Sequence, residues 1–322
     1  MTDNKMKFPK ILIMGKEYVG KTSMRSVIFA DKAPKDTFVI GYTNEINEVR
    51  TTFMGNMQLN ICDCGGQINF VNKYLTDKKH IVFDGVEILI FVIEAEKSKT
   101  PHSHNKDISN ENNNLPDIMD IDYYSQCIKY LEEYSPNAKV FVLVHKMDLV
   151  ADHKKLSVFE KRKKEIMEFS RNFNVKCFPT SIWETSLYKA WTEIVSTLIL
   201  DINKLKDSLK QISEACDAEE VILFESNTFL LTCDYSRNEI QNDQRFETIS
   251  HIVKKFRLNC GNTNSKFNSL TLKCKDFIIY LDEYTKSTYM MIISKCNKLD
   301  ISLIKFNMEA SKKAIEKIVE EK

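Results

Sequence analysis

The sequence predicts an α/β domain built on a doubly wound, mostly parallel sheet, followed by a smaller α+β domain with an antiparallel sheet. Three observations predict this. Apolar runs alternate with amphipathic segments up to about residue 200. One predicted hairpin lies early in this stretch. After residue 200 the order of the predicted elements changes. The chain has 322 residues, more than one ordinary domain needs. We expect the two domains to span residues 1–201 and 202–322.

Strands and helices alternate along the first domain. Nearly continuous β-branched and aromatic runs are typical of strands buried on both faces of a parallel sheet, and they occur at Val86–Ile93 and Lys139–Val144. Shorter strands are predicted at Lys10–Met14 and Val175–Pro179. Two further runs predict a hairpin, 46–53 and 57–63. Apolar residues at helical spacing predict helices at 20–29, 123–134, 154–173 and 186–200.

One segment of the first domain cannot form a core. Residues 97–119 are polar and rich in asparagine, which predicts a disordered surface insertion. His102 and His104 lie in it at a spacing that a metal could use, but an isolated pair in a polar loop is more often without function. The nine cysteines show no C-x-x-C pair, and we interpret them as reduced thiols.

The second domain has the order helix, two strands, helix, three strands, helix. The predicted elements are 202–215, 220–224, 228–232, 245–256, 269–273, 277–281, 289–294 and 302–319, with a turn at Glu225–Asn227. Neighbouring strands joined by short turns favour an antiparallel sheet. No catalytic constellation is visible in this domain.

Charge and hydropathy exclude several classes of partner. The formal net charge is +1, so nothing indicates binding to nucleic acid. The longest apolar runs are too short to span a bilayer, and Met1–Lys10 is not a signal region. No glycine follows Met1 and no cysteine lies near Lys322, so lipidation is not indicated. We therefore expect a cytoplasmic protein that does not insert into membranes directly.

A phosphate-binding loop is the strongest motif in the chain. Gly15 to Thr22 matches GxxxxGK[ST] between an apolar strand and a helix. Its backbone N–H groups and the helix N-terminus would surround phosphate oxygens, Lys21 would reach the β- and γ-phosphates, and Thr22 would bind Mg²⁺. The predicted contacts to nucleotide from this segment are Lys16, Glu17, Tyr18, Val19, Gly20, Lys21, Thr22 and Ser23.

A second motif, Asp63-Cys64-Gly65-Gly66-Gln67, follows the third predicted strand. Asp63 at the strand end can hold Mg²⁺ through water, and the Gly66 amide can bond a γ-phosphate. Gln67 can orient the attacking water, which makes it the candidate catalytic residue.

Two further segments predict a guanine site. Asp148 in His145-Lys146-Met147-Asp148 can accept hydrogen bonds from N1–H and the exocyclic amine of guanine, which adenine does not offer, while Lys146 can lie along the base and His145 flanks it. Thr180-Ser181-Ile182-Trp183 has two interpretations. An amide of Ser181 or Ile182 can meet the guanine carbonyl, or the Ser/Thr pair can be a helix N-cap.

The segment between the first helix and the second strand should sense the γ-phosphate. Thr43 is the candidate for a hydroxyl that binds Mg²⁺ and orders this segment in the triphosphate state, and Thr37 is a secondary contact. The metal ligands that we expect are therefore Thr22, Thr43 and Asp63, with GTP or GDP as the bound nucleotide.

Together these residues resemble the Rag GTPase family, and within it the A/B type that includes the yeast counterpart. The resemblance lies in Gly20–Ser26, in Asp63–Gln67, in Val144–Leu149 with histidine where most Ras-like proteins have asparagine, and in Thr180–Trp183 with Leu187–Trp191. It extends through Phe246–Phe256, so it covers nearly the whole chain except residues 97–119.

The resemblance implies more than the residues themselves. It implies that 202–322 is a roadblock-like domain that pairs with a C/D-type Rag subunit. It also implies a heterodimer held peripherally on the lysosome or vacuole by a lipid-anchored scaffold complex. Such heterodimers report amino-acid sufficiency to the target-of-rapamycin complex and depend on a GTPase-activating protein.

The sequence departs from the family in the loop interior, Glu17-Tyr18-Val19, where the family tends to use small residues. Glu17 near phosphates could weaken nucleotide binding by like-charge repulsion. We therefore expect a GTP hydrolase with slow unaided turnover, because neither Arg25 nor Arg50 is placed as an arginine finger. The alternatives are a nucleotide-binding scaffold subunit with little or no hydrolysis, and a lone lipidated GTPase of vesicle traffic.

Overall fold

The computed structural model describes residues 8–43, 45–55, 57–96, 120–199, 201–238, 248–249, 252–257, 267–273, 275–295 and 300–320. The predicted insertion at 97–119 lies outside these residues. The chain forms two compact units. One consists of Met1–Arg25, Asp36–Arg50 and Asn60–Glu184, and the other of Ser26–Lys35, Thr51–Leu59 and Thr185–Lys322. The domain boundary expected between residues 201 and 202 stays a prediction.

A six-stranded sheet carries the strands of the first half of the chain, in the order β2-β3-β1-β4-β5-β6. Strand β1 pairs in parallel with both β3 and β4, and β5 pairs in parallel with β4 and β6. The central strands are buried along almost their whole length, as their continuous apolar sequences predict. The strands are Lys10–Met14 (β1), Ile46–Phe53 (β2), Met57–Cys64 (β3), Val86–Glu94 (β4), Lys139–His145 (β5) and Val175–Pro179 (β6).

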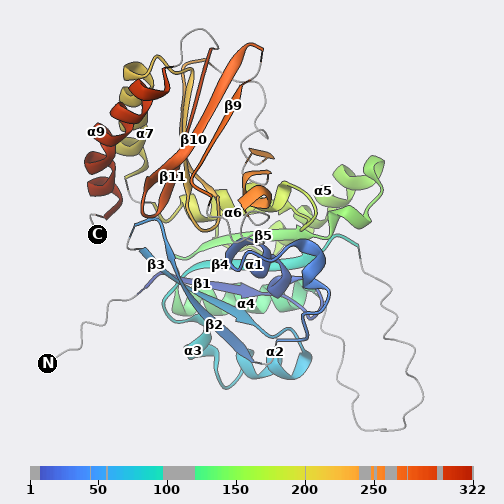
Figure 1. Ribbon diagram of the computed structural model, residues 1–322. Coiled ribbons are helices and arrows are strands. Elements are labelled where there is room, and N and C mark those ends of the chain that lie inside the picture. The colour runs from blue at the N-terminus through green and yellow to red at the C-terminus, as the bar shows by residue number, and fades with distance from the viewer. Residues whose placement is uncertain are drawn as a thin grey trace, which may run out of the picture. The chain divides into compact units, whose positions relative to one another are not determined.

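Helices connect these strands, as the doubly wound class requires (Figure 1). A core of buried aromatic and aliphatic side chains joins sheet and helices, and Phe91 packs edge-to-face against Tyr123 and Tyr124 of α4. The helices are Lys21–Phe29 (α1), Ile68–Leu75 (α2), Lys79–Phe83 (α3), Asp120–Tyr134 (α4), Asp152–Glu168 (α5) and Ser186–Ser196 (α6), with short 3-10 turns at Pro34–Thr37 (η1) and Met147–Leu149 (η3).

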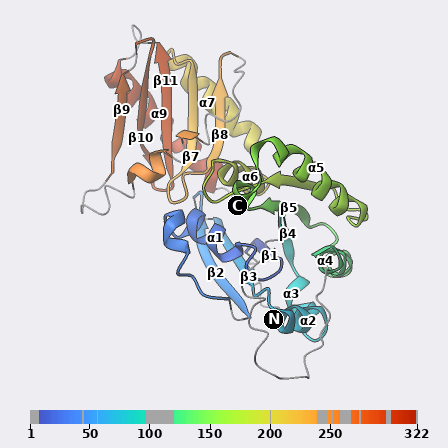
Figure 2. The same ribbon diagram turned by 90° about the vertical axis from the view of Figure 1, so that its right-hand side faces the viewer.

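A separate five-stranded sheet has the order β8-β7-β11-β10-β9, and every described pairing in it is antiparallel (Figure 2). Helices α7 and α9 lie together on one face of it (Figure 1). These elements are Ile202–Ala215 (α7), Glu220–Glu225 (β7), Leu231–Ser236 (β8), Ser269–Lys273 (β9), Phe277–Thr285 (β10), Thr288–Lys295 (β11) and Ile301–Glu320 (α9). Both parts of the predicted fold class are confirmed.

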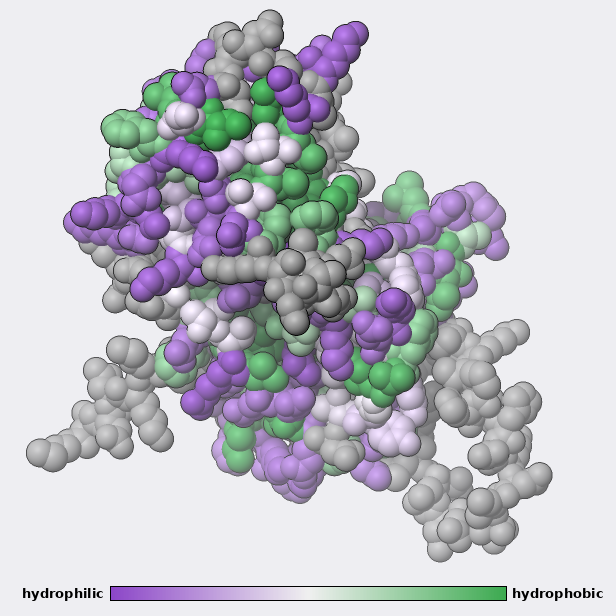
Figure 3. Space-filling model, in the orientation of Figure 1, coloured by the Kyte–Doolittle hydropathy of each residue, from purple (hydrophilic) through white to green (hydrophobic). Residues whose placement is uncertain are grey.

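The other face of this sheet is also apolar. Ile222, Phe224, Leu281 and Met291 form a buried cluster there together with Val253 of the helical residues 252–257. Leu272 of β9 and Phe277 of β10 are exposed. Figure 3 shows an apolar area at the surface over β9 and β10.

Several predicted boundaries are wrong. Helix α4 begins at Asp120 and not at residue 123, and β10 ends at Thr285 and not at residue 281. Strand β8 begins at Leu231 and not at residue 228, because the buried Glu225 carboxylate accepts hydrogen bonds from the backbone of Asn227 and Thr228 and extends the turn. Helix α5 ends at Glu168, five residues early, where the chain soon turns through Arg171 at φ 50°. Helix α6 ends at Ser196 instead of residue 200.

No helix among the described residues is long and apolar enough to cross a membrane.

Candidate nucleotide-binding site

The phosphate-binding loop follows β1 and is packed tightly on both sides. Gly15 and Gly20 have positive φ values of 144° and 96°. A Cβ atom on Gly15 would lie 2.3 Å from the Val92 carbonyl oxygen of β4, and one on Gly20 would lie 2.9 Å from the His145 ring. Only glycine fits these two positions, so β4 and β5 fix the course of the loop.

Lys21 is buried at the start of α1. Its Nζ donates to the carbonyl oxygens of Gly15 at 2.8 Å and Lys16 at 2.6 Å. Burial lowers the pKa of Lys21 to about 8, against the raising effect of the nearby Asp63 carboxylate. The ammonium is therefore held inside the curve of the loop, where a phosphate group could meet it.

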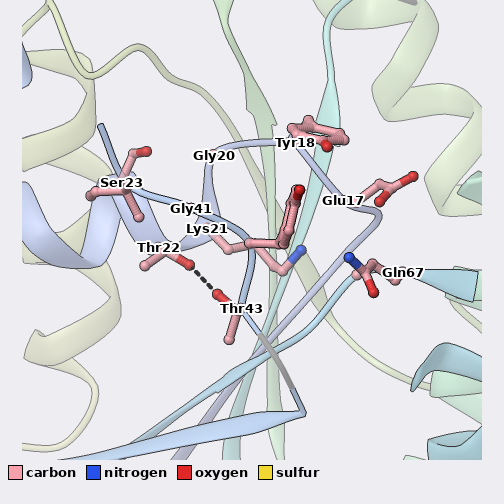
Figure 4. A pocket seen from close by; sticks show the side chains of 12 residues that line it. Glu17, Tyr18, Gly20, Lys21, Thr22, Ser23, Gly41, Thr43 and Gln67 are labelled. Carbon is pink, nitrogen blue, oxygen red and sulfur yellow. Dashed lines mark hydrogen bonds between the residues drawn. The ribbon is translucent and has the colours of Figure 1, made fainter. Parts of the chain in front are cut away.

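A cavity of about 220 Å³ opens beside the loop. Thr22 and Ser23 project from one side of it and Glu17 and Gln67 from the other in the view of Figure 4. Nine predicted residues line the cavity: Glu17, Tyr18, Gly20, Lys21, Thr22, Ser23, Thr43, Gly66 and Gln67. The sequence reasoning missed three lining residues, Ile40, Gly41 and Tyr42. Their position directly before Thr43 is the signal that could have found them.

The three predicted magnesium ligands fit a metal. The hydroxyl oxygens of Thr22 and Thr43 are 2.7 Å apart (Figure 4), close to the roughly 3 Å between adjacent ligands of an octahedral Mg²⁺. Asp63 is fully buried, and its Oδ1 has no hydrogen-bond partner among the described residues, although carboxylates are rarely left so. That oxygen could bind a metal-bound water.

Arg25 occupies the other carboxylate oxygen of Asp63. Its Nε lies 3.4 Å from Asp63 Oδ2, and both side chains are buried. The sequence reasoning placed Arg25 on a helix and did not foresee this pair. Arg25 is paired with Asp63 and does not line the cavity, so it is not placed as a finger for phosphates, while Arg50 lies exposed on β2.

Gly66 and Gln67 stand against the phosphate loop. The Glu17 amide donates to the Gly66 carbonyl oxygen at 3.0 Å, and a Cβ atom on Gly66 would lie 2.2 Å from the Glu17 nitrogen. Gln67 directly precedes α2, and its side chain does not cap that helix. Its amide is therefore available to the cavity that it lines (Figure 4).

His145 connects the phosphate loop to the segment after β6. The ring is buried, touches Gly20 and pairs through Nδ1 with the Thr180 hydroxyl at 2.9 Å. Burial lowers the pKa of His145 to about 4, so the imidazole is neutral at neutral pH.

Lys146 and Asp148 follow at the carboxyl end of β5. Lys146 has a left-handed backbone at φ 62°, and its ammonium pairs with Glu94 at the end of β4, a residue that the sequence reasoning missed. Asp148 lies exposed in η3. Glu94 could hold the Lys146 stem in place for a base that meets Asp148.

The segment after β6 decides whether Thr180 and Ser181 are the N-cap of the next helix. The Ser181 hydroxyl accepts a hydrogen bond from the Trp183 amide at 3.1 Å, and the N-cap of α6 is Thr185. The Ser/Thr pair therefore does not cap α6. A backbone amide of Ser181 or Ile182 as the contact to a base stays a prediction.

The remaining predicted residues lie around the cavity and not in it. The Val19 side chain is buried, and Lys16 Nζ lies 3.9 Å from Asp120 Oδ1. Thr37 is buried in η1, where its carbonyl oxygen accepts the Ile40 amide, and it is not among the lining residues.

The burial of His145 has a measurable consequence. Between pH 6.5 and pH 4 the unfolded chain protonates this histidine and the folded chain does not, so its contribution lowers the free energy of unfolding as pH falls through that window, by about 3 kcal/mol in total. We expect His145→Asn to remove this part of the pH dependence in urea unfolding between pH 7 and pH 4.5. The exposed His153→Asn is the control. Equal pH profiles for wild type and His145→Asn would contradict the assignment.

Comparisons with known proteins agree with this geometry. Residues 10–253 match the sequence model of the Gtr1/RagA G protein conserved region. Ras-related GTP-binding protein A of Dictyostelium discoideum is 36% identical over 310 residues, 96% of this chain and 97% of that protein. GTP-binding protein GTR1 of Saccharomyces cerevisiae is 35% identical over 328 residues, with 97% and 99% covered. GTP-binding protein GTR2 of the same yeast is more distant, at 23% over 335 residues, with 96% and 92% covered.

A family match over more than half of the chain, with relatives at this identity along nearly their full length, is decisive. The chain belongs to the Gtr1/RagA family of G proteins.

Proposed function

We propose that this chain is an A/B-type Rag GTPase that binds GTP and GDP and hydrolyses GTP slowly, with help from a GTPase-activating protein. One observation carries the proposal. The phosphate loop, the Asp63–Gln67 motif and Asp148 follow β1, β3 and β5, three parallel strands whose carboxyl ends lie at one edge of the sheet. Ligands bind at that edge in open α/β sheets.

The lining of the cavity supports hydrolysis. When bound, Mg²⁺ would neutralise charge on the phosphates, held by Thr22, Thr43 and, through water, Asp63. Lys21 would meet the β- and γ-phosphates, and the Gln67 amide would orient the attacking water. Transition-state charge then needs a further cation, because Arg25 is paired with Asp63. A slow unaided rate follows.

The alternative is a nucleotide-binding scaffold subunit with little hydrolysis, and Glu17 favours it. Glu17 lines the same cavity as Gln67, and its carboxylate would stand near the γ-phosphate and the attacking water. A negative charge there opposes the build-up of further negative charge on the phosphate. Single-turnover hydrolysis distinguishes the two functions.

The signalling role is part of the same proposal. We expect the heterodimer to sit on the lysosomal or vacuolar surface through a lipid-anchored scaffold complex and to relay amino-acid sufficiency to the target-of-rapamycin complex. The family membership supports this. The yeast relative GTR2, a second G protein of similar length, is the kind of chain that could be the C/D-type partner.

The five-stranded sheet offers a surface for that partner. Strand β9 is one of its two edge strands, so the outer backbone groups of β9 can pair with a strand of another chain. Leu272 on β9 and Phe277 at the start of β10 are 46% and 42% exposed. A paired edge flanked by buried apolar side chains is a common form of obligate interface.

Replacing Gln67 by leucine should slow hydrolysis and leave binding intact. Leucine keeps the size of the side chain but cannot orient water, so we expect the single-turnover rate to fall by at least tenfold, both alone and with an activating protein. Retained GTP turnover would make the catalytic role of Gln67 wrong, and no turnover in wild type under either condition would favour the scaffold. Gln211→Leu, exposed on α7, is the control.

Asp148→Asn should change base selection. The amide turns one acceptor into a donor, so it repels the exocyclic amine of guanine and favours a base with a carbonyl in place of that amine, as in xanthine. Loss of hydrogen bonds to a charged group predicts a rise of about 10- to 150-fold in the GDP dissociation constant. Titration with fluorescent GDP and XDP measures this, and Asp152→Asn on α5 is the control. Unchanged GDP affinity would contradict the guanine assignment.

A matched pair of leucines tests the interface. Leu272 on β9 and Leu303 on α9 are both 46% exposed. We expect Leu272→Asp to separate the chain from a co-expressed C/D-type subunit in gel filtration, because a buried unpaired carboxylate is costly, and Leu303→Asp to leave the complex intact. Affinity capture from the source cells should return such a subunit with wild type. If the wild-type chain stayed a monomer in the presence of that subunit, the alternative of a lone lipidated GTPase would be favoured instead.

A further inference from the structure

Tyr18 has an uncommon backbone for a bulky residue. It lies in the phosphate loop at φ 60°, in the left-handed region that favours glycine. Its side chain is 48% exposed, so little burial compensates for this conformation. Strained residues at functional sites often place a side chain where it acts. The Tyr18 ring stands at the mouth of the phosphate cavity (Figure 4).

Tyr42 meets this ring from a different segment. It directly precedes Thr43, it is 66% exposed, and it lines the same cavity. The ring centroids of Tyr18 and Tyr42 are 6.4 Å apart at an interplanar angle of 85°, which is the edge-to-face geometry that aromatic rings prefer. Two residues that sequence alone would leave to solvent are therefore in contact.

The two rings lie beside a second contact between the same two segments. The hydroxyl oxygens of Thr22 and Thr43 are 2.7 Å apart. The phosphate loop with its helix and the segment of Thr43 are thus joined by a polar contact at the metal site and by an aromatic contact at the mouth. A nucleotide whose phosphates lie in this cavity would lie next to both of these contacts.

We propose that Tyr18 and Tyr42 form an aromatic clasp that holds the segment of Thr43 closed and slows the release of bound nucleotide. The inference rests on the proposed nucleotide binding and assigns these two as positioning residues for it. An edge-to-face pair contributes enough to change a release rate by about 2- to 12-fold. The clasp would offset part of the repulsion that Glu17 brings to the phosphates.

Another aromatic pair provides an internal comparison. Phe38 lies on the same segment as Tyr42. The ring centroids of Phe38 and Trp183 are 5.8 Å apart, and the interplanar angle is 36°. Phe38 is 78% exposed. It holds the segment elsewhere and does not touch Tyr18 through any described ring contact. Removing Phe38 therefore loosens the segment without opening the clasp.

Release of fluorescent GDP from the purified full chain tests the clasp by a double-mutant cycle. We expect Tyr18→Ala and Tyr42→Ala each to speed release by about 2- to 12-fold, and the double variant to be no faster than the faster single variant. Tyr42→Phe should release as slowly as wild type, since the ring is kept. Tyr18→Ala and Phe38→Ala should act independently, and their effects should multiply.

Tyr18→Gly gives a readout that a merely structural role would not produce. Glycine accepts the left-handed backbone freely, so the thermal midpoint of the nucleotide-free chain should stay equal or rise while release becomes faster. Independent effects of Tyr18→Ala and Tyr42→Ala, or release unchanged in both, would overturn the clasp and leave nucleotide binding standing. A wild-type chain that binds no GDP would overturn the proposed function and the clasp together.

Discussion

The site depends on one steric constraint, the close approach of the phosphate loop to the ends of β4 and β5. The space for a Cβ atom at Gly15 is taken by the Val92 carbonyl, and at Gly20 by the His145 ring. The loop can lie there only because β1 sits in the middle of a parallel sheet, between β3 and β4. The parallel register brings the strand ends, and the polar side chains that follow them, to one edge.

Buried charge around this edge is arranged in opposite pairs. Asp63 and Arg25 are both buried and face each other, while the Lys21 ammonium is surrounded by loop carbonyls and attracted by Asp63. Removing one member would leave an uncompensated charge in a poorly solvated place, which costs about 3–5 kcal/mol. Stability and binding therefore depend on the same residues here.

Most of the fold was predictable, because the apolar runs have clear periods. The predicted bounds of β1, β6 and α7 are those observed. The miss at β8 has a tertiary cause, since a buried Glu225 carboxylate organises the turn and no local pattern reveals this. Helices α2 and α3 were not predicted, because they are short and follow a glycine motif read only for its chemistry.

The candidate site was predictable where a motif has fixed spacing and was missed where contacts cross between segments. Nine predicted residues line the cavity together. The contacts of Arg25, Glu94 and Tyr42 were not predicted, since each of these residues acts on a partner that is far away in the sequence. Pairing over such distances is set by the strand order and not by local sequence.

The contact of His145 with Gly20 and Thr180 has a consequence for how this sequence can evolve. Three residues that are distant in the sequence share one small volume, in which the imidazole fills the space that glycine leaves and the threonine hydroxyl meets its nitrogen. A substitution at any one of these positions changes the space that is available to the other two residues. Substitutions at these three positions should therefore occur together when this sequence evolves.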